Sequence, residues 1–104
     1  MPKILLAPCV TEELFEIWHF IARDNLQAAN RLMRAAEKTF RSLANNPALG
    51  RPRKFRNPRL RDVCTWTITG YRNYLIFFRL QPDTVEVLHV FHAARDIDRL
   101  LEGD

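Results

Sequence analysis

Two parts of this sequence carry residue types that can do chemistry: a run near the end of the chain and a basic segment in its middle. The first holds His89, His92 and Arg95. Histidine can accept or donate a proton near neutral pH, and arginine can stabilise charge that develops on a phosphate. If the protein is an enzyme that acts on a phosphate, His92 and Arg95 are the candidate catalytic residues.

The histidines and cysteines do not form a metal-binding pattern. His89 and His92 are three residues apart in a strand-like run, so they are expected to point to opposite faces. We expect His89 to pack in the core and His92 to lie at the end of the open face. Cys9 and Cys64 are the only cysteines, and neither belongs to a CxxC or Cys/His pattern. We therefore predict no disulfide, no metal and no cofactor.

The basic segment is the strongest polar signal in the chain. Residues 51–61 contain six cations, two prolines and no acid, which predicts a loop. The net charge of +4 favours an acidic partner, and a solvated surface loop is the equally weighted alternative for this segment. The residues predicted to bind a target are Arg51, Arg53, Lys54, Arg56, Arg59, Arg61 and Arg95.

A central hairpin must position these groups. Residues 72–80 and 85–92 are rich in β-branched and aromatic side chains and flank a turn at Pro82-Asp83, which predicts an antiparallel hairpin. A two-residue loop would place Phe78 opposite Val87 and Tyr74 opposite Phe91 on the core face. The other face would be too apolar to lie bare in water, with an Arg79–Glu86 ion pair at one end. It is the predicted binding surface for a protein partner, formed by Leu75, Phe77, Leu88, Val90 and Arg79.

The remaining periodicity completes an α+β chain. A strand over 3–7 precedes a helix capped by Thr11, and a second helix runs from a cap at Asn25 to Asn46-Pro47. A strand over 62–69 then leads into the hairpin, and residues 97–101 could form a short closing helix. We therefore predict an antiparallel sheet with a helical hairpin on one face, in one domain spanning 1–104. Its elements are an N-terminal strand, the antiparallel helical hairpin and a three-stranded antiparallel meander.

The sequence also predicts where the protein acts. It lacks an apolar run long enough to span a membrane. Its beginning has too short an apolar stretch for a secretory signal. We expect a cytoplasmic protein.

Taken together and in order, several stretches of this chain resemble the RelE/ParE toxin superfamily. The Pro-x-Leu-Gly-Arg segment and the His-Ala-Ala-Arg-Asp end are most similar to the ParE branch. This resemblance implies a bacterial toxin of a type II toxin–antitoxin system, silenced by an acidic, ParD-like antitoxin from the same operon. The stretches are ELFEIWHFIA at 13–22, NPALGR at 46–51, YLIFFR at 74–79 and VLHVFHAARD at 87–96.

The resemblance leaves two mechanisms open, because fold alone does not choose function. ParE-like members inhibit DNA gyrase by binding, whereas RelE-like members cut mRNA on the ribosome. The RelE pattern has arginines on the third strand and after the last strand, and a tyrosine in the tail. Arg95 matches the second arginine, but Leu75 occupies the third-strand position and no tyrosine follows Arg95. We therefore expect a gyrase inhibitor, with an mRNA endonuclease as the alternative and a degenerate, antitoxin-binding toxin as a third reading.

Overall fold

The predicted hairpin forms the middle of a mixed β-sheet. The structure is a computed structural model that describes residues 3–102, apart from the side chains of Asp98 and Glu102. Within these residues the strands form one five-stranded sheet in the order β1-β5-β4-β3-β2. The elements are β1 (Lys3–Leu6), α1 (Pro8–Ala22), α2 (Leu26–Asn45), η1 (Pro47–Leu49), β2 (Arg51–Pro52), η2 (Pro58–Leu60), β3 (Val63–Ile68), β4 (Tyr71–Gln81), β5 (Thr84–His92) and α3 (Ile97–Glu102).

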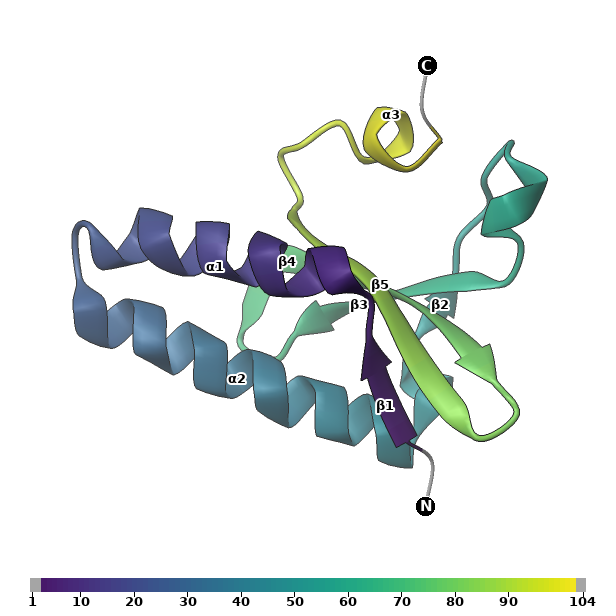
Figure 1. The fold of residues 1–104 in the computed structure, drawn as a ribbon, viewed down its shortest axis with the longest axis horizontal. Coiled ribbons are helices and arrows are strands. Elements are labelled where there is room, and N and C mark those ends of the chain that lie inside the picture. Colours follow the sequence, from purple (N-terminus) through teal and green to yellow (C-terminus); the bar gives the residue numbers. More distant parts are fainter. Residues whose placement is uncertain (1–2, 103–104) are drawn as a thin grey trace.

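The order of elements confirms the predicted α+β architecture. Strands β3, β4 and β5 form an antiparallel meander, and α1 and α2 form an antiparallel pair that extends past the sheet (Figure 1). One feature differs from the expectation of a wholly antiparallel sheet. Strand β1 pairs in parallel with β5, from Lys3 opposite Thr84 to Leu6 opposite Val87. The part of the chain that the structure describes contains no helix with the length and apolar character needed to cross a bilayer.

Local sequence signals explain both long helices. Helix α1 begins at Pro8, which is favourable at a first helical position because its missing N–H has no partner to lose there. The predicted cap at Thr11 is therefore wrong, and Cys9 belongs to the helix. Helix α2 begins as predicted, since the Asn25 side chain accepts a hydrogen bond from the Ala28 N–H at 3.0 Å.

The main core lies between the helices and the sheet. Helix α2 buries the predicted apolar stripe, while its outer face carries the charged residues. Thr39 ties this helix to the sheet, because its hydroxyl accepts a hydrogen bond from the Thr69 N–H at 3.0 Å. The buried residues of this core are Val10, Leu14, Leu32, Ala36, Phe40, Leu43, Ile68, Ile76, Phe78, Val85, Val87 and Val90.

The hairpin register follows the prediction for half its length and then shifts. The two-residue turn is confirmed, and the first four predicted pairs form, from Gln81–Thr84 to Phe78–Val87. Beyond them a β-bulge leaves Leu88 as an extra residue, so that Phe77 lies opposite His89. The predicted pairings beyond this point are wrong. The shift moves Val90 to the helix side of the sheet and brings Phe91 to the opposite side.

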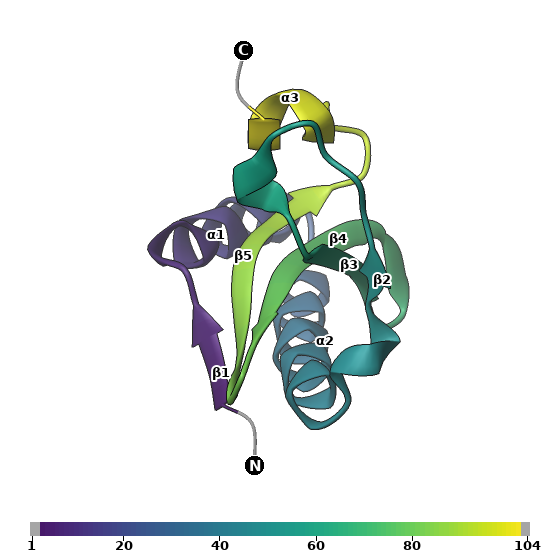
Figure 2. The same ribbon diagram turned by 90° about the vertical axis from the view of Figure 1, so that its right-hand side faces the viewer.

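The face of the sheet away from the helices has a second core of its own. Val63, Phe77, Phe91 and Ile97 are buried there. The segment between β2 and β3 and the α3 region cover them, and Figure 2 shows both at one end of the molecule. Residues 51–61 are not the plain loop predicted, because they contain β2 and η2. The expected open face is therefore wrong for Phe77, which is 0% exposed, and for Val90, which is buried in the main core.

Candidate functional site

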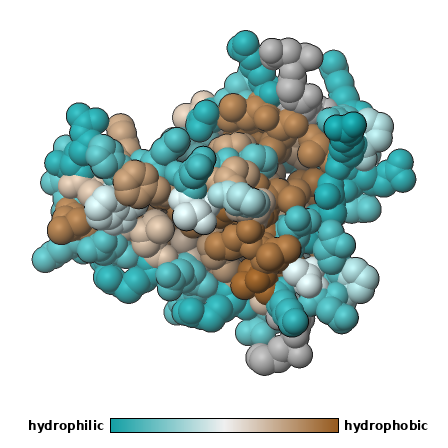
Figure 3. Space-filling model, in the orientation of Figure 1, coloured by the Kyte–Doolittle hydropathy of each residue, from teal (hydrophilic) through white to brown (hydrophobic). Residues whose placement is uncertain are grey.

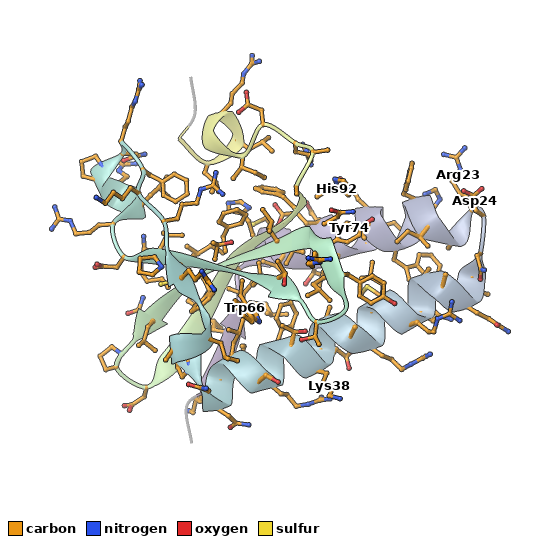
Figure 4. The ribbon with its side chains drawn as sticks, turned by 180° about the vertical axis from the view of Figure 1, so that it is seen from behind. Arg23, Asp24, Lys38, Trp66, Tyr74 and His92 are labelled. Carbon is orange, nitrogen blue, oxygen red and sulfur yellow. The ribbon has the colours of Figure 1, made fainter. Side chains whose placement is uncertain are left out.

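A groove opens where α1 passes the end of the central hairpin. It has a volume of about 490 Å³ and a largely apolar lining. Both catalytic candidates from the sequence, His92 and Arg95, lie on its wall. Figure 4 shows Tyr74 and His92 side by side at this end of the sheet, with ring centroids 5.0 Å apart and planes nearly perpendicular. The lining residues are Glu13, Glu16, Ile17, Phe20, Tyr74, Val90, Phe91, His92, Ala94 and Arg95.

The hydrogen bonding of His92 determines which proton it can move. Its Nδ1 accepts a hydrogen bond from the Ala94 N–H at 3.0 Å. A backbone N–H can only donate, so the neutral ring must carry its own proton on Nε2. The neutral His92 therefore offers a donor at Nε2, whereas abstraction of a proton from a 2′-hydroxyl there requires an acceptor.

The other polar groups of the groove are a phenol, a guanidinium and two carboxylates, from Tyr74, Arg95, Glu13 and Glu16. Burial raises the pKa of the Tyr74 phenol, which keeps it protonated at neutral pH. The Arg95 guanidinium lies over the Phe91 ring, 5.4 Å from its centroid. Glu16 is an exposed carboxylate on the α1 wall. The neutral His92 ring is therefore poorly placed to abstract a proton, whereas the groove wall offers one cation and two carboxylates.

Sequence reasoning missed Tyr74 as a neighbour of His92. A tyrosine was sought after Arg95, but this one comes from β4 and reaches His92 only because the β-bulge pairs the two residues. The sequence allows an extra residue in the hairpin, and such a residue would move every side chain beyond it to the other face of the sheet.

The basic segment is braced against the second core. The Arg53 guanidinium lies 5.5 Å from the Phe55 centroid and 5.6 Å from the Phe77 centroid, so it is partly buried over aromatic rings. Phe55 and Leu60 pack on the same core. The other cations predicted to bind a target are exposed: Arg51, Lys54, Arg56, Arg59, Arg61 and Arg95.

Arg79 holds the end of the basic segment that precedes β3. It lies directly opposite Glu86, as predicted. Its guanidinium, however, donates hydrogen bonds to the carbonyl oxygens of Arg59 and Arg61. Glu86 instead accepts a hydrogen bond from the Gln81 amide at 3.3 Å. Arg79 thus holds the basic segment in shape rather than forming the expected ion pair.

Exposed apolar side chains gather on a different surface. Figure 3 shows hydrophobic residues running from below α3 to β1. Leu5 and Leu6 of β1 and Leu100 of α3 are exposed, and Leu88 of β5 is half-buried. We call these four residues the apolar strip; Leu5 and Leu6 lie on opposite sides of the edge strand β1, because successive strand residues alternate. Leu88 is thus one of the predicted partner-binding residues that remains accessible, as is the half-buried Leu75.

His89 occupies a polar environment rather than the core position predicted for it. Its Nδ1 lies 2.7 Å from Glu13 Oε2 and 3.6 Å from Cys9 Sγ. In the described part of the chain, these three residues are the group of ligand types close enough together to hold a metal ion. Burial, followed by the nearby Glu13 charge, raises the pKa of the Cys9 thiol. Cys9 and Cys64 are free thiols.

Comparison with known proteins gives a consistent result. The chain matches the family model of the ParE toxin of type II toxin-antitoxin system, parDE, over residues 4–97. A solved structure described as a chromosomal ParDE TA system from P. aeruginosa superposes with a TM-score of 0.69 at 16% identity, over 88% of this chain and 96% of that one. At this identity the superposition establishes the fold alone. No curated protein sequence matches the chain. The family match spans nearly all the described residues, and the chain therefore belongs to the ParE toxin family of type II toxin–antitoxin systems.

Proposed function

We propose that this protein is a toxin that inhibits DNA gyrase in the cytoplasm by binding to it and that an antitoxin from the same operon neutralises it. The observation that carries the proposal is the ParE family match over residues 4–97. Gyrase inhibition is the activity that resemblance to the ParE branch implies. The hydrogen bond at His92 supports a binding role, because Nδ1 is occupied by the Ala94 N–H and a neutral ring then has no free acceptor.

The basic segment is the proposed surface for gyrase or for the DNA that gyrase holds. Arg79 and the second core hold the backbone that carries the exposed cations, so little backbone conformational entropy is lost on binding. Each phosphate contact makes log K fall with log salt by a slope of about −0.9. Arg53 is partly covered, so we expect the five exposed cations of the segment to give a slope of roughly −4 to −5 if they meet duplex DNA.

The apolar strip is the proposed antitoxin surface. Exposed leucines on the edge strand β1, with the half-buried Leu88 on the neighbouring strand, fit an added strand or the apolar side of an amphipathic helix. The toxin's net charge of +4 favours an acidic antitoxin segment. Leu88 and Leu75 remain among the proposed contacts, whereas Phe77 and Val90 are buried and do not.

A pair of matched substitutions tests the antitoxin surface. Leu5 and Leu26 are both 55% exposed, but Leu26 lies at the start of α2, at the far tip of the helical hairpin (Figure 1). We expect Leu5→Ser to weaken binding to the operon-encoded antitoxin by about tenfold or more, measured by calorimetry, and Leu26→Ser to leave it unchanged. Equal effects of the two changes would contradict the assignment.

Expression without the antitoxin tests the proposed target. We expect double-strand breaks and an SOS response with intact mRNA, together with inhibition of purified gyrase. Neutralising all five exposed cations, from Arg51 to Arg61, should reduce gyrase inhibition while circular dichroism shows an unchanged fold. Fragmented mRNA with intact DNA would refute gyrase as the target. No growth defect at all would indicate a toxin that has kept only antitoxin binding.

One observation favours the mRNA endonuclease as a second candidate. The groove brings Tyr74 and His92 into contact, and Arg95 and Glu16 lie on its walls. Together they include a cation for the phosphate, proton donors and one exposed carboxylate. If the protein cuts mRNA, Glu16→Gln and His92→Gln should each abolish cleavage while leaving antitoxin binding intact. Gyrase inhibition that survives both changes would support the first proposal.

A further inference from the structure

Where β1 ends, residues of the first turns of α1 form the hydrogen bonds to the edge of β5. Strand β1 ends at Leu6, and the Ala7 N–H still donates to the Val87 carbonyl at 2.9 Å. Beyond that point side chains replace the strand. The Cys9 thiol donates to the Leu88 carbonyl at 3.3 Å. The Glu13 carboxylate accepts from the Val90 N–H at 2.9 Å. The bulged edge of β5 is thus capped by two side chains that are also metal-ligand types.

These two side chains converge on a third. Cys9 and Glu13 lie four residues apart on α1 and therefore share one face of the helix. His89 projects from β5 between them, with Nδ1 2.7 Å from Glu13 Oε2 and 3.6 Å from Cys9 Sγ. The three ligand atoms all lie within 4.8 Å of one another. The His89 ring stacks on Phe91 at 4.8 Å, which restrains its orientation.

The spacing suits a small tetrahedral ion. Around Zn²⁺, with bond lengths of about 2.0–2.3 Å, thiolate, imidazole and carboxylate atoms lie roughly 3.3–3.7 Å apart. The Cys9–His89 separation of 3.6 Å falls in this range. The 2.7 Å contact between His89 and Glu13 is that of a shared proton, and it needs to widen by roughly 0.6–1.0 Å when a metal replaces that proton.

The same geometry disfavours a nucleophilic cysteine. In a thiol–histidine–carboxylate relay the thiol and the carboxylate must meet opposite nitrogens of the ring. Here Cys9 and Glu13 both approach Nδ1 of His89. Burial and the Glu13 charge also raise the pKa of the thiol, which lowers the fraction of reactive thiolate. A bound metal would displace the thiol proton directly.

We propose that Cys9, Glu13 and His89 form a binding site for a divalent transition metal such as Zn²⁺, with an open fourth position. A thiolate, a carboxylate and a neutral imidazole balance the two positive charges of the ion. Binding releases the thiol proton, and the neutral His89 ring carries its single proton on Nε2 instead of Nδ1 so that Nδ1 can bind the metal. Glu13 Oε1 keeps its hydrogen bond from the Val90 N–H, which holds Oε2 toward the metal. The site is partly open to solvent, since the His89 side chain is 30% exposed, so water can fill the fourth position.

Co²⁺ binding to the tag-free, reduced, full-length chain tests this site. We expect one equivalent of Co²⁺ to give a thiolate-to-cobalt charge-transfer band and the visible bands of four-coordinate cobalt, and Zn²⁺ to bleach both. Cys9→Ser should remove the charge-transfer band and weaken binding at least 100-fold. Glu13→Gln should weaken it at least tenfold. Cys64→Ser, which changes the other half-buried thiol, should leave the spectrum and affinity unchanged.

Thermal unfolding and circular dichroism show whether a variant loses metal binding because it is misfolded. Because the metal joins α1 to β5, Zn²⁺ should raise the Tm of the wild-type chain and of Cys64→Ser but not that of Cys9→Ser. Circular dichroism of the variants without metal establishes that each is folded. Absence of a charge-transfer band in the wild type, or an unchanged band in Cys9→Ser, would overturn the proposal.

Discussion

Replacement of Phe77 by alanine separates the two roles that this residue could have. The sequence places it on a surface that meets a partner, whereas the structure buries it completely, 6.1 Å from the Phe91 ring and under the Arg53 guanidinium. A buried Phe→Ala change costs about 3–5 kcal/mol through lost burial and the cavity that remains. A domain of this size has roughly 5–15 kcal/mol of stability in total. Phe77→Ala should therefore remove roughly a fifth or more of the free energy of unfolding.

Urea unfolding followed by circular dichroism measures this cost. Leu88→Ala is the matched control, because Leu88 packs on the same core but is only half-buried. It should cost roughly 1–2 kcal/mol, less than a fully buried leucine, and should weaken antitoxin binding. A cost below about 1 kcal/mol for Phe77→Ala, together with a large loss of antitoxin affinity, would show that Phe77 is an interface residue and that the second core is wrongly assigned.

Three further changes probe local features. Gly50→Ala should destabilise the fold by about 1–3 kcal/mol in the same urea assay, because a Cβ there would lie 2.1 Å from Phe78 Cζ; a neutral effect would contradict this close approach. Asn25→Ala should cost about 0.5–2 kcal/mol by removing the cap on the Ala28 N–H, and Asn25→Asp should largely restore it. Burial raises the pKa of Tyr74. Its contribution to stability is therefore fully present below the unfolded pKa of about 10 and is lost as the pH rises through the higher folded pKa. Stability should fall above about pH 10, and Tyr74→Phe should lessen that fall; an identical pH profile for the variant would contradict it.

The parts of the fold that sequence predicts are those fixed by near neighbours. The apolar stripe of α2 follows from apolar residues at helical spacing, and its cap follows from one polar residue, Asn25, just before the helix. The turn at Pro82-Asp83 and the first four hairpin pairs follow from two runs with a turn signal between them. The family resemblance rested on the order of such local motifs, and the match over residues 4–97 confirms it.

The candidate site was harder to predict because long-range packing decides it. No periodicity indicates that the basic segment folds over Phe77, because Phe55 and Leu60 are isolated apolar residues in a proline-rich stretch. The Cys9–Glu13 pair was hidden for a local reason. With a helix beginning at Thr11, Cys9 lies outside it, whereas Pro8 as the first helical residue puts the pair one turn apart.

The single extra residue at Leu88 connects these features. Without the bulge, Phe91 would lie on the helix side opposite Tyr74, and His92 would lie on the other face. With it, Phe91 completes the second core beside Phe77, and His92 moves next to Tyr74 in the groove. The bulge also lies where β5 loses β1 as a neighbour, which leaves carbonyl and N–H groups for Cys9 and Glu13 to bind. The groove, the core beneath the basic segment and the proposed metal site therefore share one cause, and deletion of Leu88 should disrupt all three together while the β1-paired half of the hairpin keeps its register.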